Sequence, residues 1–171
     1  MAWARRTFPS PLGPLTAWWD SRAIKRLFFD APPSDEPEAS DDPHGVGPAL
    51  EAYFGGDVGA LDALPAAPEG PEFQQRVWRA LREIKAGSTL SYGELAARLG
   101  LGPAAARAVG AACGANPVGV VIPCHRVVGA KGDLTGYAGG LERKRWLLLH
   151  ERAPVSRQQD LFARPGTGRQ A

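Results

Sequence analysis

The stretch VVIPCHRVVG, residues 120–129, places a thiol beside an imidazole. Cys124 is one of two cysteines among 171 residues, and it lies between Pro123 and His125 with β-branched residues on both sides. The thiolate is the nucleophilic form of cysteine, and a neighbouring base raises its fraction at neutral pH. The stretch therefore predicts a strand that stops, presents a nucleophilic thiol and starts again.

A carboxylate that could orient the base follows the last predicted helix, where Glu151 comes directly after His150. A nucleophile, a base and an orienting group together form a triad-like arrangement. Neighbouring side chains of an extended chain point in opposite directions. A direct contact between Cys124 and His125 is therefore not automatic, and a bridging water is the alternative.

Three other interpretations of the cysteines stay open. A buried thiol that only fills space is the commonest fate of a lone cysteine. A disulfide between Cys113 and Cys124 is chemically possible, although two cysteines make no disulfide framework and favour a reducing compartment. A zinc site could be drawn from Cys113, Cys124, His125 and His150, but their spacing fits no standard structural zinc pattern.

Composition and charge limit the class of protein. Apolar residues make up 44% and charged residues 22% of the sequence, which is ordinary for a globular protein. No apolar run approaches the roughly 20 residues of a membrane span, and the first ten residues lack a secretory signal core. We therefore expect a cytoplasmic protein without membrane contact, associated with the nucleoid if its source is bacterial.

The net charge of +2 hides an asymmetry. Residues 1–70 hold 5 Lys and Arg against 11 Asp and Glu, a net of −6, whereas residues 71–171 hold 15 against 7, a net of +8. A basic half is typical of a protein that binds a polyanion. The alternative is that both charged faces only keep the protein hydrated.

The elements that would position the chemistry fall into two parts. Residues 1–70 predict two or three short strands, with a turn at 9–14 and apolar runs at 15–19 and 24–29. An acidic Pro-rich loop at 31–48 and a short helix at 49–56 follow. In the second part, Phe73, Val77, Leu81 and Ile84 share one face at helical spacing, with Trp78 beside them.

Two further helices follow and suggest a helix-turn-helix. Ser91 is the expected N-cap of a helix over 91–100, and Glu94 completes a capping box. A third helix, over 102–117, carries Arg107 as its one charged residue among Ala, Val and Gly. A major-groove reader normally carries several polar side chains. The bare helix fits either a narrower groove with Arg107 as a probe, or a core position.

Together these segments resemble a known family. GANPVGVVIPCHRVVG (114–129), followed by GYAGGLERKRWLLLHE (136–151), closely resembles the signature of the O6-alkylguanine-DNA alkyltransferases. The resemblance is strong over residues 71–151 and looser before them. It implies an α/β protein: a small ribonuclease-H-like domain over 1–70 and a winged-helix or helix-turn-helix domain over 71–153. Residues 154–171 are expected to be a disordered tail.

The resemblance also implies residue roles. Cys124 would accept the alkyl group, His125 would form the thiolate through a water, and Glu151 would orient His125. Tyr92 would protonate or hydrogen-bond the leaving guanine and help to rotate the damaged nucleotide.

Further roles concern the base pocket and the DNA. Asn116 would shape the turn beneath the site, Tyr137 would line the base pocket, and backbone carbonyls near Cys124 and Val127 would read the guanine amine. Arg107 would fill the gap that the flipped base leaves in the stack. The remaining expected contacts with substrate or DNA are Ser91, Ala104, Ala105, Arg126 and Gly139.

The implied function is irreversible transfer of an alkyl group from O6-alkylguanine, and to a lesser extent from O4-alkylthymine, to the protein's own cysteine. The implied protein is a monomer that binds double-stranded DNA through the minor groove and needs no cofactor and no metal. Two alternatives stay open: a lesion sensor that binds without transfer, and a DNA-binding regulator whose cysteine records alkylation. Separately, QQDLF (Gln158 to Phe162) resembles a docking motif for the polymerase sliding clamp, unless Leu161 and Phe162 fold back on the domain.

Overall fold

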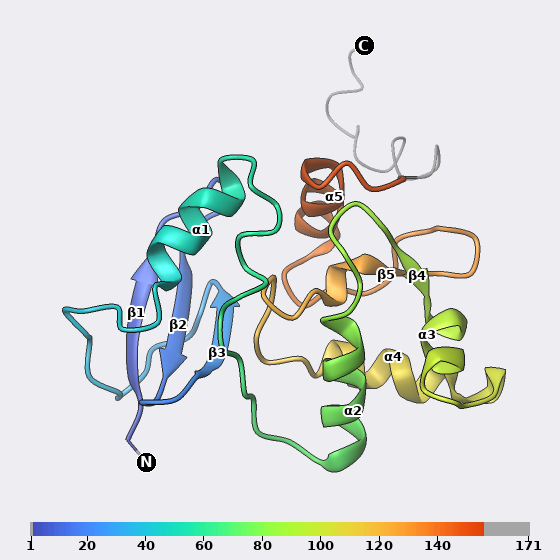
Figure 1. Cartoon of the computed structure of the whole chain (residues 1–171), viewed down its shortest axis with the longest axis horizontal. Coiled ribbons are helices and arrows are strands. Elements are labelled where there is room, and N and C mark those ends of the chain that lie inside the picture. Colours follow the sequence, from blue (N-terminus) through green and yellow to red (C-terminus); the bar gives the residue numbers. More distant parts are fainter. Residues whose placement is uncertain (1, 156–171) are drawn as a thin grey trace, which may run out of the picture.

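The computed structural model describes residues 2–155 and confirms a mixed α/β architecture (Figure 1). β1 (Ala4–Phe8), β2 (Leu15–Trp19) and β3 (Ile24–Phe29) form an antiparallel sheet in the order β1-β2-β3. α1 (Val46–Phe54) lies across one face of this sheet (Figure 1). The predicted strands at 15–19 and 24–29 are confirmed, and β1 brings the number to three, within the two or three expected.

The acidic loop is shorter and better held than expected. Its Pro37 and Ala39 exchange backbone hydrogen bonds with Arg5, at 3.0 and 2.8 Å. α1 begins at Val46, inside the segment predicted to be a loop. The physical reason is Asp42, whose carboxylate accepts hydrogen bonds from the backbone N–H groups of Val46 and Gly47 at 2.9 and 2.7 Å. Such bonds satisfy donors that the first turn of a helix leaves free.

The second part of the chain is mainly helical. Its elements are α2 (Glu72–Leu81), β4 (Leu90–Ser91), α3 (Tyr92–Arg98), the 3-10 turn η1 (Pro103–Ala105), α4 (Ala106–Gly114), the 3-10 turn η2 (Cys124–Arg126), β5 (Val127–Val128) and α5 (Leu141–His150). The predicted capping box is present, with both Ser91–Glu94 bonds formed at 2.8 and 3.0 Å. α3, the turn after it and α4 give the expected helix-turn-helix arrangement.

The expectation of a strand on both sides of Cys124 is wrong for the side before it. Residues 119–121 form a turn, Ile122 lies in a bend, and Val118 makes a single bridge to Leu27. Val120 has φ 66, a left-handed conformation that strains a β-branched residue. A strand cannot contain this reversal. The two-residue β5 follows the thiol and pairs in parallel with β4.

The free edge of β3 is covered by two segments of the chain. Leu27 pairs with the turn before Cys124, through Leu27 N–H to Pro117 O at 2.9 Å and Gly119 N–H to Leu27 O at 3.0 Å. Ile24 pairs in the same way with Pro65 and Ala67, at 2.8 and 2.9 Å. Buried residues of both parts form one continuous apolar cluster. The sheet therefore supports the turn that carries the thiol.

No helix among residues 2–155 has the length and apolar character needed to cross a membrane.

Candidate active site

The turn that presents Cys124 is held from inside by Asn116. This asparagine is buried, its amide donates to Ile122 O at 2.8 Å, and its side-chain oxygen accepts from Val118 N–H at 3.0 Å. These two bonds close the irregular segment between α4 and η2. Asn116 therefore lies where a residue that shapes the turn beneath the thiol would be needed.

His125 and Glu151 form a fully buried pair. His125 Nε2 lies 2.8 Å from Glu151 Oε2, and neither side chain is exposed to solvent. Burial works against the charge of Glu151, but the hydrogen bonds from His125 and Arg126 and the positive charge of Arg126 outweigh it and lower the pKa of Glu151 to about 2. Glu151 is thus a carboxylate near neutral pH and can accept but not donate.

This pairing fixes the protons of His125. Because a carboxylate only accepts, Nε2 carries the hydrogen, and burial lowers the pKa of His125 against the opposing effect of Glu151, so that the ring is neutral. The second nitrogen, Nδ1, is buried and has no hydrogen-bond partner among residues 2–155. A buried unpaired acceptor is uncommon in native proteins. Here it belongs to the residue next to the thiol.

Cys124 and His125 lie in the same 3-10 turn rather than in extended chain. The opposite directions that an extended backbone gives to neighbouring side chains therefore do not apply to this pair. Burial raises the pKa of the Cys124 thiol, while the Asn116 amide and the positive charge of Lys144 act against that rise. The thiol needs a base to become a thiolate, and the unpaired Nδ1 belongs to its neighbour.

Arg126 has a different place from the one expected. Its guanidinium is buried and donates to both oxygens of Glu151, from Nε at 2.8 Å and Nη2 at 3.0 Å, and from Nη1 to Ile84 O at 2.6 Å. A side chain held in this way cannot reach a DNA phosphate or base. The expectation that Arg126 contacts DNA is therefore corrected: Arg126 neutralises and fixes Glu151.

Tyr92 and Tyr137 border a cavity of about 160 Å³ beside Cys124. Thr135 Oγ1 donates to the Tyr92 hydroxyl at 3.0 Å, which leaves the phenolic proton of Tyr92 free to be donated. Burial raises the pKa of Tyr92, so the phenol keeps that proton at neutral pH. The Tyr137 ring lies edge-on to His125, with 6.4 Å between the ring centroids.

A smaller cavity of about 50 Å³ adjoins the first and shares Cys113, Cys124, Tyr137 and Ala138 with it. Gly139 belongs to this second lining, and its position tolerates no side chain, because a Cβ would lie 2.9 Å from the Tyr137 ring. Val127 is buried in β5, directly after η2.

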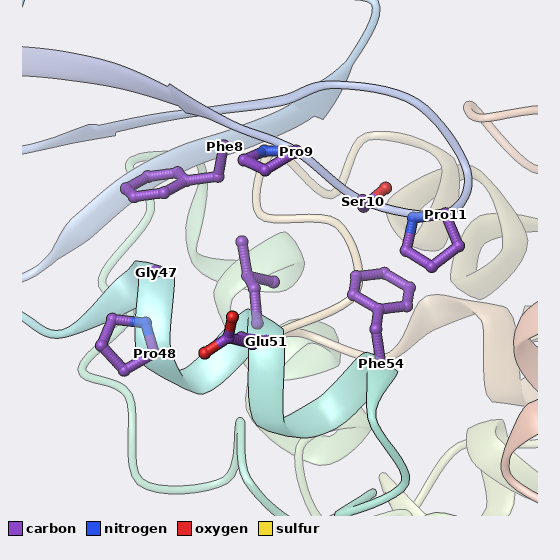
Figure 2. A pocket seen from close by; sticks show the side chains of 9 residues that line it. Phe8, Pro9, Ser10, Pro11, Gly47, Pro48, Glu51 and Phe54 are labelled. Atoms are coloured by element: carbon purple, nitrogen blue, oxygen red, sulfur yellow. The ribbon is translucent and has the colours of Figure 1, made fainter.

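A larger hollow lies elsewhere (Figure 2). It has a volume of about 500 Å³ between the turn after β1 and α1, and its lining consists of Phe8, Pro9, Ser10, Pro11, Gly47, Pro48, Leu50, Glu51 and Phe54. No cysteine, histidine or tyrosine is among these residues. The nucleophile, base and phenol are therefore found at the smaller cavities beside Cys124, not in this hollow.

The outer face of α4 and η1 carries small side chains and, at Arg107, one charge. Ala104, Arg107, Ala108 and Ala111 are exposed, while Ala105 is half-buried. The opposite face, with Val109, Ala112 and Cys113, packs in the core. Only one face of α4 is therefore in the core, and Arg107 is exposed among the alanines of the other face. Ser91 caps α3 directly before Tyr92.

The zinc alternative finds no support. No group of three or more His, Cys, Asp or Glu within residues 2–155 could hold a metal ion. His125 is bound to Glu151, and His150 donates from Nε2 to Tyr53 O at 2.6 Å. Cys113 and Cys124 are both free thiols.

Two side chains at the site have no role in the prediction from sequence, Lys144 and Tyr53. Lys144 is completely buried and donates from Nζ to Thr135 O at 2.7 Å; burial lowers its pKa to about 8. Its spacing from Leu147, Leu148 and Glu151 is helical and could have placed it on the inner face of α5. Tyr53, the second, donates to Glu151 from a distant part of the sequence.

Comparisons with known proteins match this chain to one family. Residues 72–153 match the family model for the 6-O-methylguanine DNA methyltransferase DNA-binding domain. The methylated-DNA–protein-cysteine methyltransferase of Salmonella typhimurium is 56% identical over 109 residues, which cover 64% of this chain and 63% of the relative. The chain thus spans less than two thirds of that relative's length.

Other similarities extend further. The methylated-DNA–protein-cysteine methyltransferase of Haemophilus influenzae is 44% identical over 153 residues, covering 86% of this chain and 85% of the relative. Among solved structures, Mycobacterium tuberculosis OGT in complex with DNA is 39% identical, with a TM-score of 0.78 over 93% of this chain and 99% of that one. The similarity therefore includes the N-terminal sheet as well as the helical part.

Proposed function

Because the chain belongs to the methylated-DNA–protein-cysteine methyltransferase family, we propose that it repairs O6-alkylguanine in DNA by moving the alkyl group to Cys124. The observation that carries this proposal is the buried, unpaired Nδ1 of His125, which follows the free thiol Cys124 in the same 3-10 turn and is oriented through Nε2 by Glu151. A nucleophile, a base and an oriented carboxylate are the parts that thiol activation requires.

The reaction starts with the proton of the thiol. His125 takes it at Nδ1, directly or through a water, and Glu151 stabilises the imidazolium that forms. The positive charge of Lys144 favours the thiolate, which the buried setting otherwise disfavours. Arg126 keeps Glu151 ionised throughout.

The thiolate then displaces guanine. A sulfur electron pair forms the S–C bond, the C–O6 bond breaks, and its electron pair stays on the guanine. Tyr92 supports the leaving base by donating its phenolic hydrogen bond or proton, since Thr135 occupies the acceptor side of its hydroxyl. Overall, the proton lost by the thiol is gained by guanine. The thioether is stable, so each chain repairs one lesion, and the steps use the chain's own side chains.

The proposed substrate geometry requires base flipping. The O6 carbon lies inside the base stack, so the nucleotide must rotate out before the sulfur can reach it. We place the small exposed face of α4 in the minor groove, with Arg107 in the gap left in the stack. The crystal structure of the Mycobacterium tuberculosis relative with DNA supports a DNA partner. Binding through basic residues should weaken as salt concentration rises.

The remaining expectations belong to the same proposal. We propose a monomer that acts where the DNA is, inside the cell, with domains at 1–70 and 71–153. O4-alkylthymine is a lesser substrate. Docking on a sliding clamp through Gln158 to Phe162 concerns residues outside the described ones. Of the tail expected at 154–171, only residues 154 and 155 are described. A pull-down with purified clamp, comparing the full chain with one ending at Ser156, tests the docking; equal retention contradicts it.

Counting repaired lesions tests the function. Limiting protein is incubated with excess duplex carrying one O6-methylguanine, and the restored guanines are counted at completion. We expect one per chain, and none with Cys124→Ser. Continued turnover, or equal repair by the variant, contradicts suicide transfer.

A further inference from the structure

His150 and Glu151, at the end of α5, are both hydrogen-bonded to one residue of the N-terminal part, Tyr53. Tyr53 is the second-to-last residue of α1 and is completely buried. Its hydroxyl donates to Glu151 Oε2 at 2.5 Å, and its backbone oxygen accepts from His150 Nε2 at 2.6 Å. The two bonds fix the end of α5 relative to α1.

Aromatic contacts surround this connection. Tyr53 lies edge-on to His150, with 5.1 Å between centroids, and His150 stacks on Trp146 at 4.8 Å. Phe54 contacts the same two residues, at 6.2 and 5.7 Å. The rings can hold the helices together without the hydroxyl of Tyr53. Packing therefore does not explain why a hydroxyl is buried there, facing a carboxylate.

The hydroxyl joins a crowded acceptor. Glu151 Oε2 receives three donors: Tyr53 from α1, and His125 and Arg126 from the turn that carries the thiol. The carboxylate cannot rotate about its last torsion, which is soft in a free glutamate, without losing several of these bonds. Burial and the charge of Glu151 raise the pKa of Tyr53 well above its ordinary value, so the phenol is always a donor.

We propose that Tyr53 is a positioning residue for alkyl transfer, through which the N-terminal part holds Glu151 in place for His125. The inference rests on the proposed function. It has two measurable consequences. Without the hydroxyl, Glu151 and the His125 ring lose a restraint, so transfer slows. The carboxylate also faces His125 with a less neutralised charge, which favours the imidazolium, so the base is lost at a higher pH.

Tyr53→Phe removes the hydroxyl and keeps the ring. We expect transfer from a duplex with O6-methylguanine to slow about tenfold, the factor that corresponds to about 1.4 kcal/mol. We also expect the acidic limb of the pH–rate profile to move to higher pH, with unchanged affinity for DNA. Phe54→Leu is the matched control: it disturbs the same α1–α5 contact without touching Glu151, and should leave that limb in place.

A second substitution should shift the acidic limb in the opposite direction. With 3-fluorotyrosine in place of Tyr53, the more acidic hydroxyl donates more strongly, and the acidic limb should move to lower pH. If Tyr53→Phe does not fold, the pH–rate profile of the 3-fluorotyrosine protein alone tests the inference. An unmoved limb in the folded Tyr53 proteins, or an equal shift with Phe54→Leu, overturns the inference. If the unaltered protein transfers no alkyl group, it is the proposed function that fails.

Discussion

Replacing Glu151 by glutamine removes a fully buried negative charge from the centre of the site. Burial opposes this charge, but His125 and Arg126 outweigh it, so that the pKa of Glu151 falls from 4.5 to about 2. This lowering of the pKa corresponds to about 3–4 kcal/mol of folding stability near neutral pH, at about 1.4 kcal/mol for a pKa change of one. Removing one partner of a buried ion pair costs about 3–5 kcal/mol in other proteins. The same range therefore follows from the pKa of Glu151 and from the loss of a buried ion-pair partner.

The pH dependence follows from the direction of the shift. A carboxyl group whose pKa is lower in the folded protein adds stability that is fully present above its unfolded pKa and is lost as pH falls through its folded one. For Glu151 that window runs from 4.5 down to about 2. The deficit of Glu151→Gln should therefore be largest near neutral pH and shrink across this window.

The assay is denaturant unfolding of both proteins at neutral pH and at successively lower pH. Glu142→Gln is the matched control, because Glu142 is exposed in the first turn of the same helix; its effect should stay below about 1 kcal/mol. If Glu151→Gln is as stable as the unaltered protein at neutral pH, the reasoning is refuted. A deficit that does not change on acidification refutes it as well.

Three further substitutions separate the other roles. Lys144→Met removes a buried cation beside the thiol, so alkylation of Cys124 by iodoacetamide should require a higher pH; an unchanged profile contradicts the role of Lys144. Tyr92→Phe should slow transfer about a hundredfold, in the usual range for loss of a proton donor, with lesion binding retained in a single-turnover assay. Arg107→Ala should slow transfer from duplex DNA about tenfold, since flipping a base costs a few kcal/mol, and leave transfer from a free O6-alkylguanine base unchanged.

Much of the fold could be predicted because its signals are local. The apolar face of α2 and the Ser91–Glu94 capping box use residues three or four positions apart, and both are confirmed. α1 starts earlier than the sequence predicts, because the Asp42 carboxylate accepts hydrogen bonds from its first two N–H groups and lies in a segment that composition alone marks as a loop. The turn before Cys124 was predicted as a strand, since β-branched residues favour strands and no rule signals a left-handed valine at 120.

The site divides in the same way. The sequence motif predicts Cys124, His125 and Glu151 as site residues, and the structure places His125 and Glu151 in direct contact. Arg126 was assigned to DNA because sequence does not show which side of a 3-10 turn faces inward. Tyr53 lies 98 residues before Glu151, and its role depends on how α1 meets α5. No spacing within either segment reveals that contact.

The mass of the intact protein after incubation with a duplex containing one O6-methylguanine tests the central claim most directly. We predict a gain of one methyl group, located at Cys124 by peptide mapping and absent from Cys124→Ser. Tight binding to the lesion without any change in mass would contradict the account, and would make this site a recognition pocket rather than an acceptor of the alkyl group.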